Sequence, residues 1–171
     1  MNSDALHTEI RALTDRAEIT DLFDRYLHSL DDPGQEYDEN WAAAFFTADA
    51  STATPAGEVR GRGAVRANVA TAMRLFTRTV HFGSNYVIEV DGDLATLRGN
   101  QLSTHVLASD GELFVSGGRT DNALVRTAAG WRLSRADLHI AWTQGSPPVL
   151  PPELGGTGGS LQGASQGASH R

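Results

Sequence analysis

The chain of 171 residues contains no cysteine and no lysine, and these absences exclude several chemistries at once. Without cysteine there is no disulfide, no zinc–thiolate site and no cysteine nucleophile. Without lysine no Schiff base can form and no amine can act as a general base. No apolar run approaches the roughly 20 residues that a membrane helix needs, and the N-terminus lacks a signal-peptide pattern. We therefore expect a cytoplasmic protein with no membrane partner.

Positive charge is also scarce. The chain has 14 basic and 21 acidic residues, and its net charge of −7 argues against nucleic acid as a partner. The length fits one domain, and the 40% hydrophobic content suits a globular core. Composition changes at Gly145, so we predict a domain over residues 1–144 and a Pro/Gly/Ser-rich, largely disordered tail over 145–171. Within the tail, Pro147 to Pro152 can lie extended over a neighbouring surface.

Apolar residues at three- and four-residue steps predict helices in the first half of the chain. The clearest lies in ITDLFDRYLHSLDD, residues 19–32, and Asp15 with Glu18 has the spacing of a capping box at its start. A weaker helical segment over residues 1–13 precedes it. The further elements expected before residue 77 are a short helix over 40–47, a small hairpin of 51–54 with 57–60, and a helix over 61–76.

After Phe76 the pattern changes to the period of two that is typical of strands. The predicted strands are 80–90, 94–108, 112–126 and 131–143, joined by short turns. A long antiparallel meander must twist and curl, and helices must cover its concave face. The sequence therefore predicts an α+β fold: a cone in which a curled, mainly antiparallel sheet is covered by three N-terminal helices, with a pocket between them.

Two polar groups near the end of the main helix are candidate catalytic residues. Tyr26 shares a helix face with Leu22 and Leu30 and should point inward. Asp31 lies about 140° further round, so it can turn inward only if the helix ends near Leu30. The following DDPG is a strong stop signal. An inward carboxylate would need a partner, and the alternative is a solvated loop aspartate.

The strands add two histidines. Gln101, Ser103 and His105 share one face of the second strand, which should be the concave one. His81 opens the first strand, and the nearby Gly83 permits a bulge or close packing. A single inward histidine is more often a hydrogen-bonded core residue than a catalyst. Two histidines, a tyrosine and an aspartate that the topology can bring together instead indicate a cavity.

Four segments together resemble the nuclear transport factor 2-like superfamily, and specifically its SnoaL-like branch. They are RAEITDLFDRYLHSLD (16–31), NWAAAFFTADA (40–50), TVHFGSN (79–85) and GGRTDNALVRTAAGWRLSR (117–135). That branch includes scytalone dehydratase, the bile-acid 7α-dehydratase and the hexachlorocyclohexane dehydrochlorinase. The resemblance implies a catalytic pair of Asp31 and His81, with Tyr26 and His105 as further active-site groups. It also implies a homo-oligomer, with a trimer preferred over a dimer, and the apolar Leu102 and Val106 on the outer face of the sheet agree with this.

The sequence departs from these enzymes in its substrate-binding half. The late arginine of the dehydrochlorinase falls on or near Ala136, with Arg135 adjacent, and Tyr37 or Trp41 is only a loose counterpart of a second tyrosine in scytalone dehydratase. The register of the third strand stays open, and a slip of one residue would exchange its two faces. The residues predicted to contact a substrate are Leu22, Trp41, Phe45, Gln101, Ser103, Thr120, Asn122, Leu138 and Trp142.

The chemistry follows from these groups. Asp31 bound to one nitrogen of His81 makes the other nitrogen a general base, and Tyr26 or a protonated His105 can donate to a substrate oxygen. The spacing of the histidines matches no common metal motif, so we expect neither a metal nor an organic cofactor. We predict a cofactor-independent lyase of the dehydratase type, acting on a hydrophobic cyclic small molecule. The alternatives are a cyclase or isomerase of polyketide or terpenoid tailoring with the same dyad, and a non-catalytic small-molecule-binding protein.

Overall fold

The computed structural model describes residues 3–55 and 57–154. Over these residues the chain forms three helices, followed and interrupted by six strands. The elements are α1 (Ser3–Asp31), α2 (Glu39–Phe45), β1 (Phe46–Thr54), β2 (Gly57–Arg60), α3 (Arg62–Met73), β3 (Phe76–Asp91), β4 (Leu94–Leu107), β5 (Leu113–Thr127) and β6 (Gly130–Gln144).

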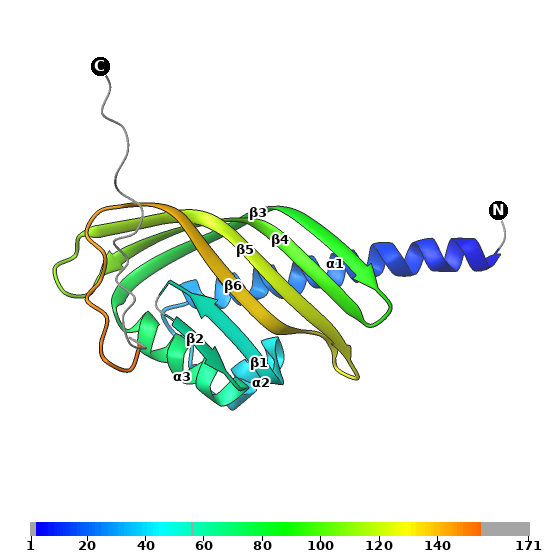
Figure 1. Ribbon diagram of the computed structural model, residues 1–171, viewed down its shortest axis with the longest axis horizontal. Coiled ribbons are helices and arrows are strands. Elements are labelled where there is room, and N and C mark those ends of the chain that lie inside the picture. The colour runs from blue at the N-terminus through cyan, green and yellow to red at the C-terminus, as the bar shows by residue number, and fades with distance from the viewer. Residues whose placement is uncertain (1–2, 56, 155–171) are drawn as a thin grey trace, which may run out of the picture.

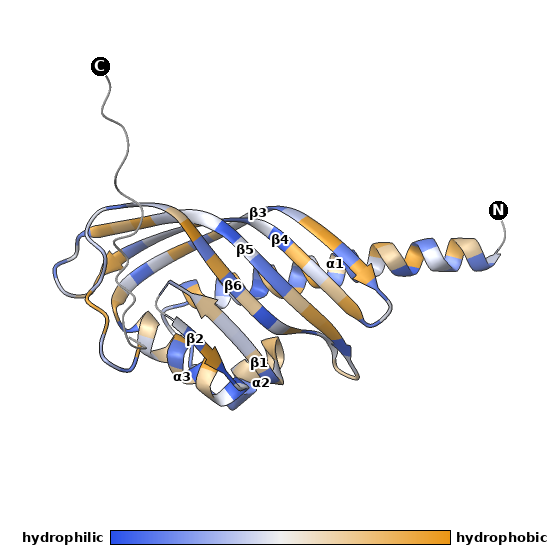
Figure 2. Ribbon diagram, viewed as in Figure 1, coloured by the Kyte–Doolittle hydropathy of each residue, from blue (hydrophilic) through white to orange (hydrophobic). Residues whose placement is uncertain are grey.

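The strands form one sheet in the order β2-β1-β6-β5-β4-β3. All neighbours are antiparallel except β1 and β6, which are parallel. The four long strands curl over α1 (Figure 1). Helices α2 and α3 lie beside the short strands β1 and β2, in the lower part of the view in Figure 1. In Figure 2 the long strands alternate between hydrophobic and hydrophilic bands, as expected for a sheet with one buried face. The predicted α+β cone is confirmed.

The first helix differs from the prediction. A short segment followed by a helix starting near Asp15 was expected, but α1 runs unbroken from Ser3 to Asp31. The side chain of Asp15 does not cap anything: it is buried and accepts two hydrogen bonds of 2.7 Å from Arg126 on β5. The capping-box spacing was misleading because a buried ion pair, which the local sequence does not reveal, explains the aspartate.

The boundaries of the other elements differ by a few residues. The second helix ends at Phe45 because Phe46 already has an extended backbone and begins β1, five residues before the predicted hairpin strand. The third helix is shorter at both ends than predicted. The first long strand begins at Phe76 rather than Val80, and this earlier start places Thr79 in β3 on the same face as His81.

A bulge in β3 explains two glycines. The pairing of β3 with β4 shifts between Ser84 and Val87, and Asn85 there has a φ of 57°. Tyr86 turns back toward α1 and donates a hydrogen bond of 2.7 Å to Asp24. Its ring lies so close that a Cβ on Gly83 would come within 2.1 Å of the Tyr86 hydroxyl oxygen, and one on Gly99 within 2.6 Å of the ring. Of the bulge and the close packing that were predicted as alternatives for Gly83, the close packing is present, since the Tyr86 side chain occupies the space of a Cβ there.

Residues 145–154 follow β6 without regular structure, and Leu154 is buried. Of the tail over 145–171 that was predicted to be largely disordered, residues 155–171 lie outside the described residues. Among the described helices, none combines the length and the apolar character needed to cross a membrane.

Candidate active site

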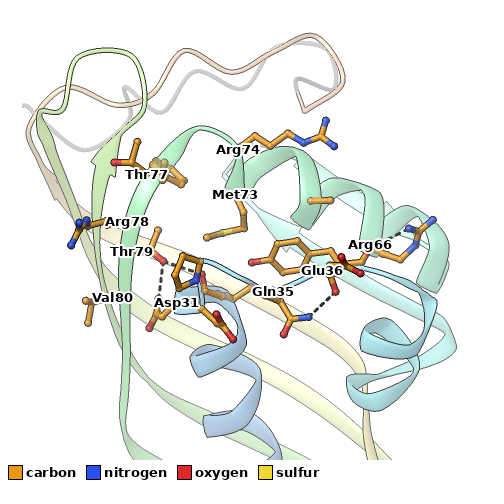
Figure 3. A pocket seen from close by; sticks show the side chains of 16 residues that line it. Asp31, Gln35, Glu36, Arg66, Met73, Arg74, Thr77, Arg78, Thr79 and Val80 are labelled. Carbon is orange, nitrogen blue, oxygen red and sulfur yellow. Dashed lines mark hydrogen bonds between the residues drawn. The ribbon is translucent and has the colours of Figure 1, made fainter.

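The end of α1 meets the start of β3 at a pair of side chains. Asp31 is the last residue of the helix, and its Oδ1 lies 2.7 Å from Nδ1 of His81. The backbone N–H of His81 donates to the other carboxylate oxygen at 2.8 Å. The hydroxyl of Thr79 donates to Oδ1 at 2.8 Å (Figure 3). The predicted contact between Asp31 and His81 is present, and the helix ends where an inward turn of Asp31 requires it.

These hydrogen bonds define the protonation of the pair. Burial opposes ionisation of Asp31 and is the largest single influence on it, but the hydrogen bonds from His81 and Thr79 together outweigh it and lower the pKa of the carboxyl group. Because a carboxylate only accepts, Nδ1 of His81 carries a proton. When the ring carries only this proton, Nε2 has a lone pair that can accept a proton, as a general base requires.

His81 lines a partly open cavity of about 230 Å³ between the sheet and helices α1 and α3. The polar part of its wall comes mainly from β4 and β5, and the apolar part comes mainly from α1, α3, β6 and the segment after β6. The cavity is lined by seven further residues predicted for the site: Tyr26, Gln101, Ser103, His105, Thr120, Asn122 and Leu138. The open register of the third strand is thereby resolved, since Thr120 and Asn122 lie on the concave face. Among the described lining residues there is no arginine.

His105 is held between two aromatic rings. Its ring centroid lies 4.3 Å from that of Phe76 and 5.9 Å from that of Phe114, and Nδ1 lies 3.4 Å from the Phe114 carbonyl oxygen. The ring of His81 approaches edge-on at 5.2 Å. Burial, followed by the charge of a protonated His81, lowers the pKa of His105 to about 4. At neutral pH His105 is therefore uncharged, which removes the predicted option of a protonated donor there.

Tyr26 lies deeper on α1, with its ring packed edge-on against Phe45 and Phe46 at centroid distances of 5.7 and 5.4 Å. Burial is the main cause that raises the pKa of its hydroxyl well above the ordinary value, with the charge of Tyr37 adding to it. The hydroxyl is therefore a neutral hydrogen-bond donor over the physiological pH range.

Four residues predicted to contact substrate do not line the cavity. Leu22, Trp41 and Phe45 belong to the hydrophobic core behind it. Trp41 is used to attach α2 to α1, since its indole N–H donates to Ser29 at 3.0 Å. Trp142 lies on the outer face of the sheet, against Gly117. The reason is a bulge: Gly117 pairs with Trp142 but Gly118 with Ile140, so the extra residue reverses the alternation of β6.

The cavity also contains residues that the sequence analysis missed. Ser116 is in phase with Thr120 and Asn122, so the period of two could have identified it. Asn68 on α3 and Thr52 on β1 had no comparable signal. Leu150 and Leu154 line the cavity from the segment after β6, where they are the large apolar residues besides Val149. Their apolar character in a Pro- and Gly-rich stretch was the available signal.

A larger, open groove of about 1040 Å³ lies on the other side of Asp31 (Figure 3). It shares Leu30, Met73 and Phe76 with the cavity, so these three side chains form the partition between the two spaces. Asp31 lines the groove, whereas His81 lines the cavity. We therefore place the site in the cavity. Within the described residues no three side chains of His, Asp or Glu are grouped as metal ligands would be.

A curled, mainly antiparallel sheet covered by helices around a central cavity defines the class of nuclear transport factor 2-like folds. A model of the SnoaL-like domain matches residues 11–137, and the chain belongs to that family. No protein of curated function gives a significant match.

Solved structures agree with this assignment. The Kfla4162 protein from Kribbella flavida is 29% identical, with a TM-score of 0.70 over 78% of this chain and 95% of that one. A nuclear transport factor 2-like superfamily protein from Salmonella enterica serovar Typhimurium is 24% identical, with a TM-score of 0.69 over 75% and 92%. A candidate scytalone dehydratase from Novosphingobium aromaticivorans is 22% identical, with a TM-score of 0.69 over 82% and 95%. The last two likenesses concern the fold alone.

Proposed function

We propose that the protein is a cofactor-independent lyase of the dehydratase type that acts on a small, uncharged cyclic molecule. The observation that carries the proposal is the Asp31–His81 pair, whose histidine lines a largely apolar cavity. A base oriented by a carboxylate is the arrangement that proton abstraction needs. Membership of the SnoaL-like family and the fold shared with a candidate scytalone dehydratase support the same reaction class.

The proposed reaction begins at a carbon next to a carbonyl group. Nε2 of His81 removes a proton from that carbon, and the electron pair moves toward the carbonyl oxygen, which Tyr26 stabilises by donating a hydrogen bond. The C–O bond at the neighbouring carbon then breaks as the new C=C bond forms. The imidazolium of His81 returns its proton to the departing hydroxide, so one water leaves and the enzyme regains its starting state.

The cavity limits the substrate. Its volume of about 230 Å³ is below the ~300–1000 Å³ typical of ligand pockets, which favours one or two rings. The described lining residues include no arginine to pair with an anion, which favours a neutral molecule. Gln101, Ser103 and Ser116 supply hydrogen bonds on the polar wall, so hydroxyl or carbonyl groups at one edge of the ring would be recognised.

An isomerase is the second candidate. It would use the same proton removal by His81 but return the proton to another carbon. The neutral state of His105 favours it, since no second charged acid assists a leaving hydroxyl at neutral pH.

The test is incubation with a panel of neutral cyclic β-hydroxy ketones, followed by mass spectrometry. A dehydratase yields a product lighter by one water, and an isomerase yields a product of unchanged mass. His81→Ala should lower the turnover rate about 10²–10⁴-fold with little change in substrate binding. A folded His81→Ala variant with full activity would exclude the dyad, and ligand binding without any turnover would favour a binding protein.

A further inference from the structure

Thr79 contacts both the carboxylate of the dyad and the end of the helix that carries it. Its hydroxyl oxygen lies 2.8 Å from Oδ1 of Asp31 and 3.0 Å from the carbonyl oxygen of Leu30. A hydroxyl has one proton to donate, so the group bridges two acceptors. Figure 3 shows Thr79 beside Asp31 at the wall of the outer groove.

The position of Asp31 explains why such a donor is needed. Asp31 is the last residue of α1, where the negative end of the helix dipole disfavours a carboxylate and the final carbonyl groups have no donors within the helix. The side-chain and backbone donors of His81 supply one hydrogen bond to each carboxylate oxygen. The hydroxyl of Thr79 adds a third and offers the Leu30 carbonyl a donor at the same time.

The geometry of β3 makes Thr79 a precise partner. Thr79 and His81 are two residues apart in the strand, so both side chains project from the same face. Threonine is branched at Cβ, which restricts rotation about χ1 and keeps the hydroxyl in place. Both side chains therefore reach the same oxygen, Oδ1 of Asp31, from adjacent positions on one rigid strand.

We propose that Thr79 is a positioning residue of the dyad, which holds Asp31 in the orientation that accepts the Nδ1 proton of His81 and so keeps Nε2 unprotonated toward the cavity. The role in catalysis rests on the proposed function, in which His81 is the base. The role in fixing the imidazole tautomer does not, and it can be measured without a substrate.

The variants are Thr79→Val, which keeps the shape and removes the hydroxyl, and Thr79→Ser, which keeps the hydroxyl. Thr77→Val is the matched control: Thr77 lies two residues earlier in β3, at a shift in the pairing with β4, is exposed, and donates a hydrogen bond of 3.4 Å to the Val106 carbonyl oxygen. The readout is ¹⁵N NMR of the histidine rings in labelled protein, with the His81 signals assigned by comparison with His81→Gln. It reports which ring nitrogen carries the proton.

The wild type, Thr79→Ser and Thr77→Val should each show one His81 tautomer, protonated at Nδ1. Thr79→Val should show a mixture of both tautomers and faster exchange of the Nδ1 proton with water. Once a substrate is identified, Thr79→Val should lower kcat about 10–100-fold with KM unchanged, by analogy with the loss on removing the hydrogen-bond partners that orient metal ligands.

Two results would overturn the proposal. One is a folded Thr79→Val protein with the wild-type tautomer and the wild-type exchange of the Nδ1 proton. The other is unfolding of Thr79→Val and of a further variant, Thr79→Ala, while Thr79→Ser stays folded, which would show that the hydroxyl serves the end of α1 rather than the dyad. If no compound in the panel is turned over, the proposed function fails while the tautomer measurement still decides the role of Thr79.

Discussion

The ion pair between Asp15 and Arg126 should be the interaction whose loss destabilises the fold most per side chain. Asp15 is only 4% exposed and accepts from both terminal nitrogens of Arg126 at 2.7 Å. The guanidinium also lies 4.3 Å from the centre of the Trp131 ring and bonds to Asp93 at 2.9 Å. Replacing Arg126 by methionine keeps an apolar side chain over Trp131 but leaves the buried carboxylate of Asp15 without its ion-pair partner.

Breaking a buried pair from one side costs about 3–5 kcal/mol. Because the side chain of Arg126 is still 20% exposed, we expect the lower end, about 3 kcal/mol. For a domain of this size that corresponds to a fall in Tm of about 6–12 °C. Asp15→Leu with Arg126→Met removes both charges, so the double variant should lie within about 1 kcal/mol of the wild type.

Urea unfolding followed by circular dichroism measures these free energies. Arg25→Met is the control, since the Arg25–Asp21 pair has a similar distance of 2.8 Å but side chains 57% and 66% exposed, and it should change stability by less than about 0.5 kcal/mol. The reasoning is refuted if Arg126→Met and Arg25→Met have equal effects, or if the double variant is less stable than Arg126→Met.

Three further predictions concern other parts of the molecule. Gly83→Ala should destabilise the fold by about 1–3 kcal/mol because its Cβ would meet Tyr86. Gly63→Ala, in α3 with open space around it, should stabilise the fold by about 0.5–1 kcal/mol. The same unfolding assay measures both variants, and equal effects would contradict the packing argument. The pKa of His105 is lowered to about 4 from an ordinary 6.5, so between these pH values the unfolded chain binds a proton that the folded chain does not. The free energy of unfolding should therefore fall by roughly 3 kcal/mol as pH drops from 6.5 to 4. His105→Gln should lose this pH dependence, and an unchanged pH dependence would show that another group causes it. The outer face of the sheet exposes Phe82, Leu102 and Trp142, which should be covered in a homo-oligomer, with a trimer preferred over a dimer. Light scattering measures the mass in solution, and a monomer at micromolar concentration would refute this prediction.

The sequence predicted the parts of the structure that periodicity controls. The apolar stripe of α1, the four long strands and the concave face of β4 with Gln101, Ser103 and His105 all follow from local patterns. Apolar side chains repeat at the period of the element that buries them, so such elements can be recognised without knowing what they pack against.

What the sequence could not reveal depends on partners far along the chain. Asp15 resembled a helix cap because nothing near it indicates Arg126, which lies 111 residues later. A pattern of period two places Trp142 on the cavity face, but one extra residue in β6 turns its side chain to the outer face. The local pattern does not reveal such a residue. Thr79 was overlooked because the predicted strand began one residue after it. In each case a single long-range contact or a one-residue shift outweighs the local pattern.

The long first helix is attached to the sheet on two opposite sides. Asp24 and Asp31 bond to Tyr86 and His81 on β3, whereas Asp15 bonds to Arg126 on β5. Asp15 and Asp24 are nine residues apart, about half a turn around the helix axis, and Asp24 and Asp31 point nearly the same way. Attachment on opposite faces prevents the helix from rotating about its own axis, the motion that would carry Asp31 away from His81. Inserting or deleting one residue between Asp15 and Asp31 would rotate one of these side chains about 100° away from its partner on the sheet. The length of this segment should therefore be invariant. The exposed turns from Ser3 to Thr14 are free to vary in length.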